Sequence, residues 1–189
     1  NMSENFENIE ENNEELSMDM IRLLTIDDFC QLLSTPAPVP GGGSVSAYVA
    51  SLGAALAGMV ANLTSGKKKY AEYQDEIEDI IKAANILRED LMEGISKDAE
   101  SFLPLAGAYS LPANTEEEKR IKEKTLEELL VVAASAPLEL IKKIIPAMEI
   151  LERLTDIGTK LAISDVGTGL LLCDAAATAA ALNVYCNTK

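Results

Sequence analysis

The stretch PGGGSVSAYVASLGAALAGMVA, residues 40–61, decides the fold of this chain. It contains no charged residue and consists mainly of Gly, Ala and Ser. A helix with so little polar surface must be surrounded by protein. We therefore predict a central buried helix, with Ser44 as its N-cap and Gly66 at its end. Small residues that recur at helical spacing would let other helices approach it closely: Ala47, Ser51, Ala55 and Gly58.

The apolar character of this stretch also raises the possibility of a membrane span, since the uncharged run covers residues 36–66. A second apolar stretch, residues 161–186, retains Asp165 and Asp174, and charges of this kind argue against a lipid environment. Two helices that are apolar all round are many for one small domain to bury. We therefore expect a soluble all-α helical bundle that buries them in a homodimer.

Amphipathic helices are expected on either side of the glycine-rich loop at residues 34–43. Thr25 has the pattern of an N-cap for a short helix that ends at Leu33. Apolar residues then recur every three or four positions from residue 70 to 102, which predicts a long helix with Pro104 as its stop.

The last third of the chain carries two more helix signals. Thr115 and the three glutamates after it indicate a helix start. Pro137 and Pro146 are expected to kink or divide that helix before Leu154. Ser164 is the expected cap of the final helix.

Composition limits what the chain can do. Its 189 residues favour one domain, expected at 25–189, preceded by an acidic N-terminal arm at 1–24 that is expected to be disordered or extended. The net charge of −15 argues against a nucleic-acid partner. With no histidine, acid–base chemistry falls to Asp, Glu, Lys or Tyr. Three widely spaced cysteines indicate neither a zinc site nor a disulfide framework, so we expect a cytoplasmic protein.

The loop Gly41-Gly42-Gly43-Ser44 allows two interpretations. Free backbone N–H groups and the positive end of a helix dipole form an anion site. Alternatively, the glycines only allow a tight turn and a close approach between helices. No P-loop or dinucleotide-binding pattern is present.

Three consecutive lysines, Lys67, Lys68 and Lys69, follow the far end of the same helix. Cations at a helix C-terminus and in a solvated turn explain them without any function. A carboxylate-rich ligand is the other explanation. In an antiparallel dimer, the lysines of one subunit could lie near the glycine loop of the other.

Asp98 is the acidic residue that does not fit its helix. It lies three positions after Ile95 and four before Phe102, so it falls on the apolar stripe. A buried carboxylate is costly unless it has a partner or a function. One explanation is a structural partner, in an internal ion pair or a helix-end hydrogen bond, and the other is a role in catalysis. Asp165 and Asp174 are weaker candidates.

The same residues occur within a wider pattern. The chain resembles the cyclodeaminase/cyclohydrolase family of tetrahydrofolate enzymes over roughly residues 25–189. The family includes stand-alone bacterial methenyltetrahydrofolate cyclohydrolases and the C-terminal domain of formimidoyltransferase-cyclodeaminase. The resemblance rests on five strings in order: Pro-Gly-Gly-Gly-Ser from Pro40, Gly66-Lys-Lys-Lys-Tyr70, Asp98-Ala-Glu-Ser-Phe102, Ser164-Asp165 and Asn183-Val184.

This resemblance implies an all-helical dimer that acts on a reduced folate, with or without a polyglutamate tail, and has Asp98 as catalytic residue. The implied reaction is hydrolysis of 5,10-methenyltetrahydrofolate, with Asp98 as general base and no metal or redox cofactor. Cyclodeamination of formiminotetrahydrofolate, and a folate-binding dimer without activity, are the alternatives. The expected substrate-binding residues are Gly41, Gly42, Gly43, Ser44, Lys67, Lys68, Tyr70, Ser164 and Asp165.

Overall fold

The computed structural model describes residues 18–188, and every regular element within them is helical. Two short helices, α2 (Met18–Ile21) and α3 (Ile26–Leu33), come first. The long helices are α4 (Gly42–Thr64), α5 (Gln74–Ala108), α6 (Glu116–Ile157) and α7 (Ile163–Asn187). Two 3-10 turns connect them, η1 (Lys68–Tyr73) before α5 and η2 (Lys160–Ala162) before α7. The prediction of an all-α bundle is confirmed.

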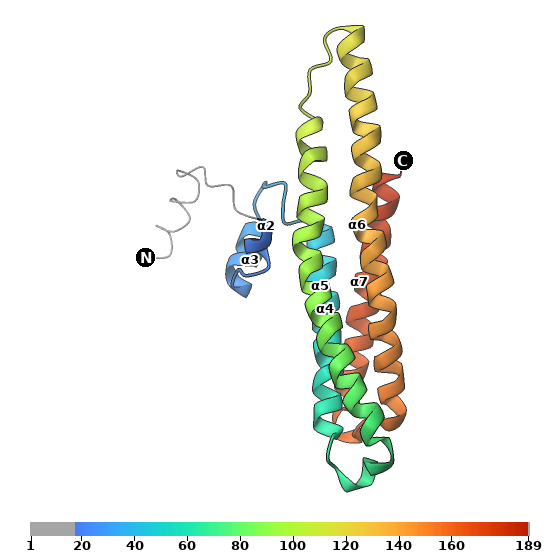
Figure 1. The fold of residues 1–189 in the computed structure, drawn as a ribbon. Coiled ribbons are helices and arrows are strands. Elements are labelled where there is room, and N and C mark those ends of the chain that lie inside the picture. Colours follow the sequence, from blue (N-terminus) through green and yellow to red (C-terminus); the bar gives the residue numbers. More distant parts are fainter. Residues whose placement is uncertain (1–17, 189) are drawn as a thin grey trace, which may run out of the picture.

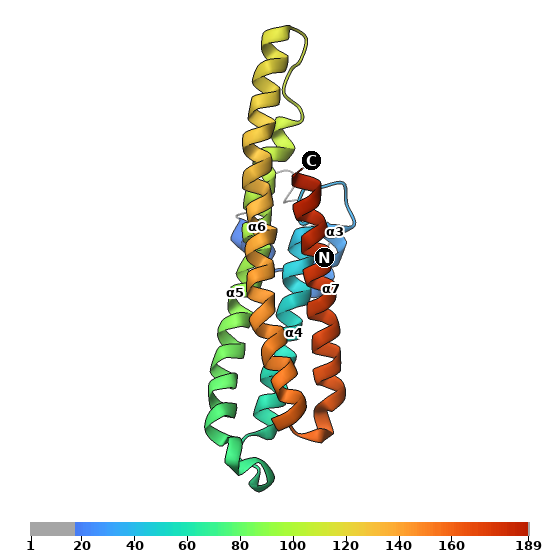
Figure 2. The ribbon, with the colours of Figure 1, turned by 90° about the vertical axis from the view of Figure 1, so that its right-hand side faces the viewer.

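The four long helices form an elongated bundle in which each runs beside the next (Figure 1). Helices α5 and α6 are longer than α4 and α7, so the α5–α6 hairpin extends beyond one end of the bundle, as both views show (Figure 2). The Lys122 ammonium closes the turn of this hairpin by donating to the carbonyl oxygens of Tyr109, at 2.7 Å, and Leu111, at 2.9 Å. The glycine-rich loop enters α4 near the base of the hairpin.

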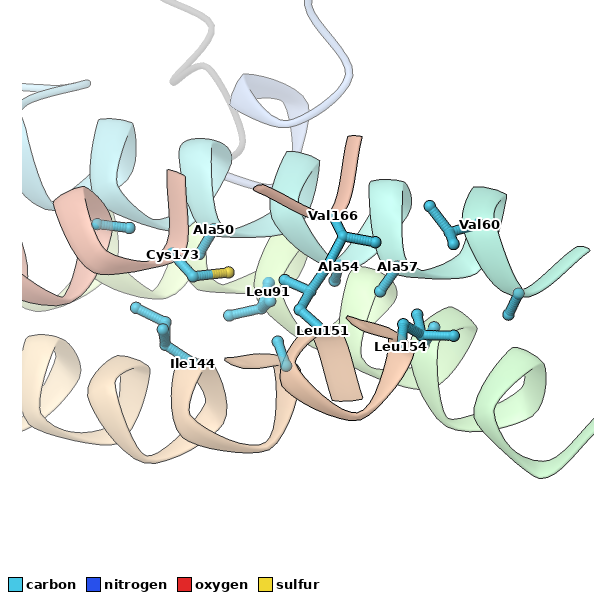
Figure 3. Packing of buried hydrophobic residues seen from close by; sticks show 14 of the residues in the cluster. Ala50, Ala54, Ala57, Val60, Leu91, Ile144, Leu151, Leu154, Val166 and Cys173 are labelled. Carbon is cyan, nitrogen blue, oxygen red and sulfur yellow. The ribbon is translucent and has the colours of Figure 1, made fainter. Parts of the chain in front are cut away.

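Helix α4 is the centre of the core, as its composition predicts. Its alanines lie against large aliphatic side chains of the other three helices, and Ala50, Ala54 and Ala57 are almost fully buried (Figure 3). Helices α4 and α7 approach each other closely at Gly53, where an added Cβ would lie 2.5 Å from Sγ of Cys173. Small side chains are therefore required at this crossing, because the helix axes would otherwise have to separate.

Two of the predicted caps are present. The Thr25 hydroxyl accepts a hydrogen bond from the main-chain N–H of Asp28 at 3.1 Å. Thr115 and Glu118 form a reciprocal capping box at the start of α6. The other two predictions were wrong. The glycines are already helical from Gly42, so Gly41 and not Ser44 is the N-cap of α4. Ala162 takes the N-cap position of α7, and Ser164 lies exposed inside the helix.

Proline does not end or divide the long helices. Helix α5 continues past Pro104 to Ala108, with Pro104 exposed and the next residue, Leu105, fully buried. Proline lacks the N–H that would bond the carbonyl four residues earlier, and Glu100 at that position is an exposed residue. Helix α6 runs through both Pro137 and Pro146 to Ile157 without a break. The predicted stop at Pro104 and the predicted division of α6 were therefore wrong.

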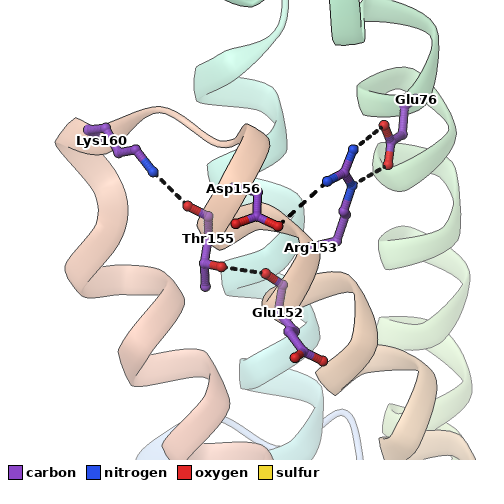
Figure 4. Close-up of polar contacts among 6 residues, drawn as sticks. All are labelled: Glu76, Glu152, Arg153, Thr155, Asp156 and Lys160. Atoms are coloured by element: carbon purple, nitrogen blue, oxygen red, sulfur yellow. Dashed lines mark hydrogen bonds and ion pairs between the residues drawn. The ribbon is translucent and has the colours of Figure 1, made fainter.

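Ion pairs at the other end of the bundle join α5 to α6 (Figure 4). The guanidinium of Arg153 donates to both carboxylate oxygens of Glu76, at 2.7 and 3.0 Å, and lies 3.6 Å from Asp156. The short connection from α6 to α7 lies at the same end, and in it the Lys160 ammonium donates to the carbonyl oxygen of Thr155 at 2.6 Å (Figure 4).

The first described residues lie within the segment that was expected to be an arm. Helix α2 places Ile21 in the core, with only 2% of its surface exposed. The acidic residues that define the rest of the arm, within residues 1–17, lie outside the described part of the chain.

Two helical segments, Gly42–Thr64 and Lys160–Asn187, are long and apolar enough to cross a membrane by length and composition. They differ in burial, since 56% of the apolar window is buried in the first and only 22% in the second. Helix α7 therefore presents an apolar face outside the bundle, with Leu171 73% exposed and Leu182 61% exposed. Leu52, Met59 and Leu63 of α4 are exposed as well.

Candidate functional site

Asp98 and the glycine loop meet at the N-terminus of α4. Gly43 lies so close to Asp98 that an added Cβ would lie 1.9 Å from its Oδ1 and 2.4 Å from its Cγ. No side chain larger than hydrogen fits at position 43 while the carboxyl group keeps this position. The requirement for glycine here is thus steric, a close approach between α4 and α5, and the backbone angle at Gly43 is an ordinary helical one.

Ser44 ties the carboxyl group to α4. Its hydroxyl lies 2.9 Å from Oδ2 of Asp98, and its main-chain N–H also helps to lower the pKa of this carboxyl group. The first-turn N–H groups of a helix have no partner within the helix and carry a partial positive charge. Asp98, which belongs to α5, therefore acts as the missing side-chain cap of α4. Of the two interpretations of the glycine loop, the structure shows the close approach between helices, and the acidic group that lies at this helix start belongs to the chain itself.

The environment of Asp98 acts on its pKa in two opposite directions. Burial in the interface between α4 and α5 raises the pKa of the Asp98 carboxyl above its usual value, because the charged form loses hydration. The hydrogen bonds from the side chain and main chain of Ser44 lower it again, and burial is the larger effect. Asp98 is therefore a carboxylate that takes up a proton more readily than an exposed aspartate.

A cavity of about 230 Å³ opens beside Asp98. Its walls come from the loop before α4, the first turn of α4, and one helix turn each of α5, α6 and α7. The lining residues are Pro38, Val39, Gly41, Gly42, Gly43, Asp98, Phe102, Ala133, Asn183, Cys186 and Asn187. A polar carboxyl group in a partly apolar recess is a typical setting for acid–base chemistry on a small ligand.

Asn183 is the lining residue that sequence reasoning came closest to but did not select as a site residue. Its amide atoms lie 3.6 and 3.7 Å from the position of a Cβ on Gly42, so it faces the glycine loop across the cavity. One amide hydrogen is used by the carbonyl oxygen of Ala179, at 3.2 Å. The remaining amide N–H and the side-chain oxygen are available to a ligand. The spacing of apolar residues does not single out Asn183, because the helix around it is rich in alanine on every side.

Lys67 and Tyr70 lie at the opposite end of the bundle, where they have structural partners. The Lys67 ammonium donates to the hydroxyl of Thr159 at 3.2 Å, and the Tyr70 hydroxyl accepts from the main-chain N–H of Lys160 at 3.3 Å. That hydrogen bond holds the pKa of Tyr70 below its usual value. These contacts attach η1 to the connection between α6 and α7.

The other expected site residues at this end are freer. Lys68 and Ser164 are exposed, and Asp165 is half-buried in the first turn of α7. Helix α4 separates this end from the glycine loop by its full length, about 33 Å for 23 residues. The structure thus brings Gly41, Gly42, Gly43 and Ser44 together with Asp98, and it places Lys67, Lys68, Tyr70, Ser164 and Asp165 far from them within one subunit.

Comparison with known proteins identifies related sequences for nearly all of the described chain. A sequence model of the Formiminotransferase-cyclodeaminase family matches residues 25–189. A methenyltetrahydrofolate cyclohydrolase from Methylorubrum extorquens is 39% identical over 165 residues, which cover 87% of this chain and 79% of that protein.

Cyclodeaminases are also similar to this chain. A formimidoyltransferase-cyclodeaminase from Rattus norvegicus is 31% identical over 161 residues, which cover 85% of this chain and 30% of that protein. A crystal structure of a formiminotetrahydrofolate cyclodeaminase from Thermotoga maritima superposes with a TM-score of 0.77 at 33% identity, covering 87% of this chain and 78% of that one.

Proposed function

This chain belongs to the formiminotransferase-cyclodeaminase family, and on that premise we propose that it is a one-carbon folate enzyme that hydrolyses 5,10-methenyltetrahydrofolate to 10-formyltetrahydrofolate. The observation that carries this proposal is the 39% identity to a methenyltetrahydrofolate cyclohydrolase over 79% of that protein. The chain matches only 30% of the length of the longer formimidoyltransferase-cyclodeaminase from rat.

In the proposed reaction, Asp98 is the general base. The bridging methenyl carbon is an iminium carbon and therefore already an electrophile, so a water molecule positioned beside it needs only to lose a proton as it attacks. Asp98 takes that proton and returns it to N5 as the bond between the bridging carbon and N5 breaks. The new hydroxyl group loses its own proton to solvent, which leaves the formyl group on N10. We propose that this step needs no metal or redox cofactor, because the substrate itself carries the activated carbon.

The raised pKa of Asp98 supports this role. A carboxyl group that both accepts and returns a proton within one turnover works best when neither form is strongly favoured. Burial favours the protonated form and Ser44 favours the ionised form, as described above. The polar amide of Asn183 lies on the opposite wall, where it can orient the heterocycle of the substrate.

Cyclodeamination is the second candidate. A cyclodeaminase of known structure superposes on this chain over 87% of its length. In that reaction, N10 closes on the formimino carbon and Asp98 gives its proton to the departing ammonia. Both reactions pass through the same methenyl ring, so the site geometry serves either one, and the products distinguish them.

We also propose that the enzyme is a cytoplasmic homodimer with sites built from both subunits. The exposed apolar faces of α4 and α7 support self-association, because a surface of this kind on a single helix pair is normally covered. Antiparallel packing of two copies would bring the lysine end of one subunit to the glycine end of the other. Lys67 and Lys68 would then meet the glutamyl carboxylates of a folate held beside Asp98.

Mixed dimers test the shared site. Asp98→Asn and Lys68→Glu each damage a different contribution to the same composite site. If each site takes Asp98 from one subunit and Lys68 from the other, a hybrid dimer retains one intact site, and an equal mixture recovers about a quarter of wild-type activity after subunit exchange. Two inactive variants that stay inactive when mixed would show that the lysines do not act in trans.

A further inference from the structure

The Ser44 hydroxyl lies between two acceptors. Its Oγ is 2.9 Å from Oδ2 of Asp98 and 3.3 Å from the main-chain carbonyl oxygen of Ile95. A serine hydroxyl has one hydrogen to donate and lone pairs with which to accept. Ser44 is fully buried, so water does not supply a substitute partner. The direction of its hydrogen bond therefore depends on whether Asp98 holds a proton.

We propose that Ser44 is a positioning residue that reverses its hydrogen bond as Asp98 gains and loses a proton. With Asp98 ionised, the Ser44 hydroxyl donates to Oδ2. With Asp98 protonated, the carboxylic acid donates to Ser44 Oγ, and the serine hydrogen turns to the carbonyl oxygen of Ile95. The exchange of hydrogen bonds does not depend on the proposed function. Only the role of this proton in catalysis rests on the proposed function.

This exchange leaves each buried group with a partner in both states. An unpaired buried hydroxyl or carboxyl group is costly, and a base that lost its partner on protonation would be held in one form. The carbonyl of Ile95 can accept the second hydrogen bond because its oxygen has two lone pairs. Asp98 therefore keeps one orientation toward the cavity throughout a turnover.

No other charged group faces Asp98 from the described residues that line the cavity. Helix α4 contributes Gly43 and Ser44, α5 contributes Phe102, and α6 contributes Ala133. Helix α7 contributes two asparagines and the thiol of Cys186, which is the remaining titratable group on the wall. The protonation of Asp98 is thus set mainly by burial and by Ser44.

The test is Ser44→Ala, with the Asp98 carboxyl followed by infrared difference spectroscopy against Asp98→Asn across a pH titration. The ionised form loses a charge-assisted bond and the protonated form a weaker one. We expect Asp98 to titrate at a higher pH in Ser44→Ala, and the carbonyl stretch of the protonated acid to shift to higher frequency. An unchanged titration and an unchanged stretch would overturn the proposal.

Ser51→Ala is the matched control. Ser51 is buried in the same helix and donates to the carbonyl oxygen of Tyr48 at 2.7 Å, away from Asp98. It must leave both infrared readouts at their wild-type values. Ser44→Cys keeps a weak donor and acceptor in the same place, and its titration should lie between those of wild type and Ser44→Ala.

Turnover gives a separate readout. In Ser44→Ala the acidic limb of the rate profile should move to higher pH, so that rates below the midpoint fall by about three- to tenfold while the plateau stays within about threefold of wild type. The infrared titration needs no folate. A shifted titration with an unshifted rate profile would support the Ser44 exchange and contradict the proposed use of Asp98 as the base.

Discussion

Gly43→Ala is the substitution that the site geometry opposes most directly. The added Cβ would lie 1.9 Å from Oδ1 of Asp98, and ordinary contact between carbon and oxygen needs more than 3 Å. The carboxyl group must move by more than an ångström. A shift of this size away from α4 breaks the hydrogen bond with Ser44, because it lengthens the 2.9 Å distance between Ser44 Oγ and Oδ2 of Asp98 beyond hydrogen-bonding range.

Two consequences of this shift have estimable sizes. Misplacement of a reacting group by about 1 Å reduces turnover by about a hundredfold. Loss of a hydrogen bond to a partly buried carboxylate destabilises the fold by about 2 kcal/mol, which lowers the Tm by about 4–8 °C in a chain of this length.

The assay is consumption of 5,10-methenyltetrahydrofolate by purified Gly43→Ala, together with a thermal melt. Gly107→Ala is the control, because nothing lies within 4 Å of a Cβ added there and the residue is exposed on α5. It should keep wild-type turnover and gain slightly in stability, since alanine favours helix over glycine. Wild-type turnover and stability in Gly43→Ala would refute the assignment of Asp98 to this contact.

Four further outcomes are expected. Asp98→Asn should reduce turnover by about a hundredfold or more in the absorbance assay while the melt shows a folded protein; wild-type rates would remove Asp98 from the mechanism. Turnover of wild type should be lost as the pH falls through the raised pKa of Asp98, since only the ionised form acts as base. Because the pKa of Asp98 is higher in the folded protein than in the unfolded chain, its protonation adds to the free energy of unfolding at low pH. This contribution is complete below the usual aspartate pKa and is lost as the pH rises through the pKa of the folded protein. Asp98→Asn should therefore flatten this part of the pH dependence when the free energy of unfolding is measured by denaturant titration. Burial raises the pKa of Cys173 to about 11, so iodoacetamide at pH 8 should label the exposed Cys30 and Cys186 of the native protein but not Cys173, as mass spectrometry would show. Bound folate should protect Cys186, because this residue lines the cavity.

Much of the architecture follows from local patterns in the sequence. The apolar period of residues 70–102, the capping box at Thr115 and the small residues of the central helix each indicate helix without reference to the rest of the chain. Proline was the main source of error, because Pro104, Pro137 and Pro146 normally interrupt helices. The packing that carries α5 and α6 through these positions comes from helices distant in sequence, and no local pattern reports it.

The candidate site divides in the same way. Asp98 could be selected because a carboxylate on an apolar stripe needs an explanation, and the structure provides one in Ser44. The role of Ser44 could not be predicted, since its partner is 54 residues away. Asn183 could not be predicted either, because its helix has alanines on every face and the sequence does not show which face lines the cavity. The 33 Å or so between the glycine loop and Lys68 also follows only once α4 is known to be continuous.

The central claim is best tested by giving the purified protein 5,10-methenyltetrahydrofolate and following the loss of its absorbance against a control without enzyme. A parallel reaction supplies formiminotetrahydrofolate and measures ammonia. Rapid consumption of the methenyl compound without ammonia release is the predicted result. Ammonia release in the second reaction would instead establish the cyclodeaminase, and inactivity in both, with folate still bound, would contradict catalysis by this chain.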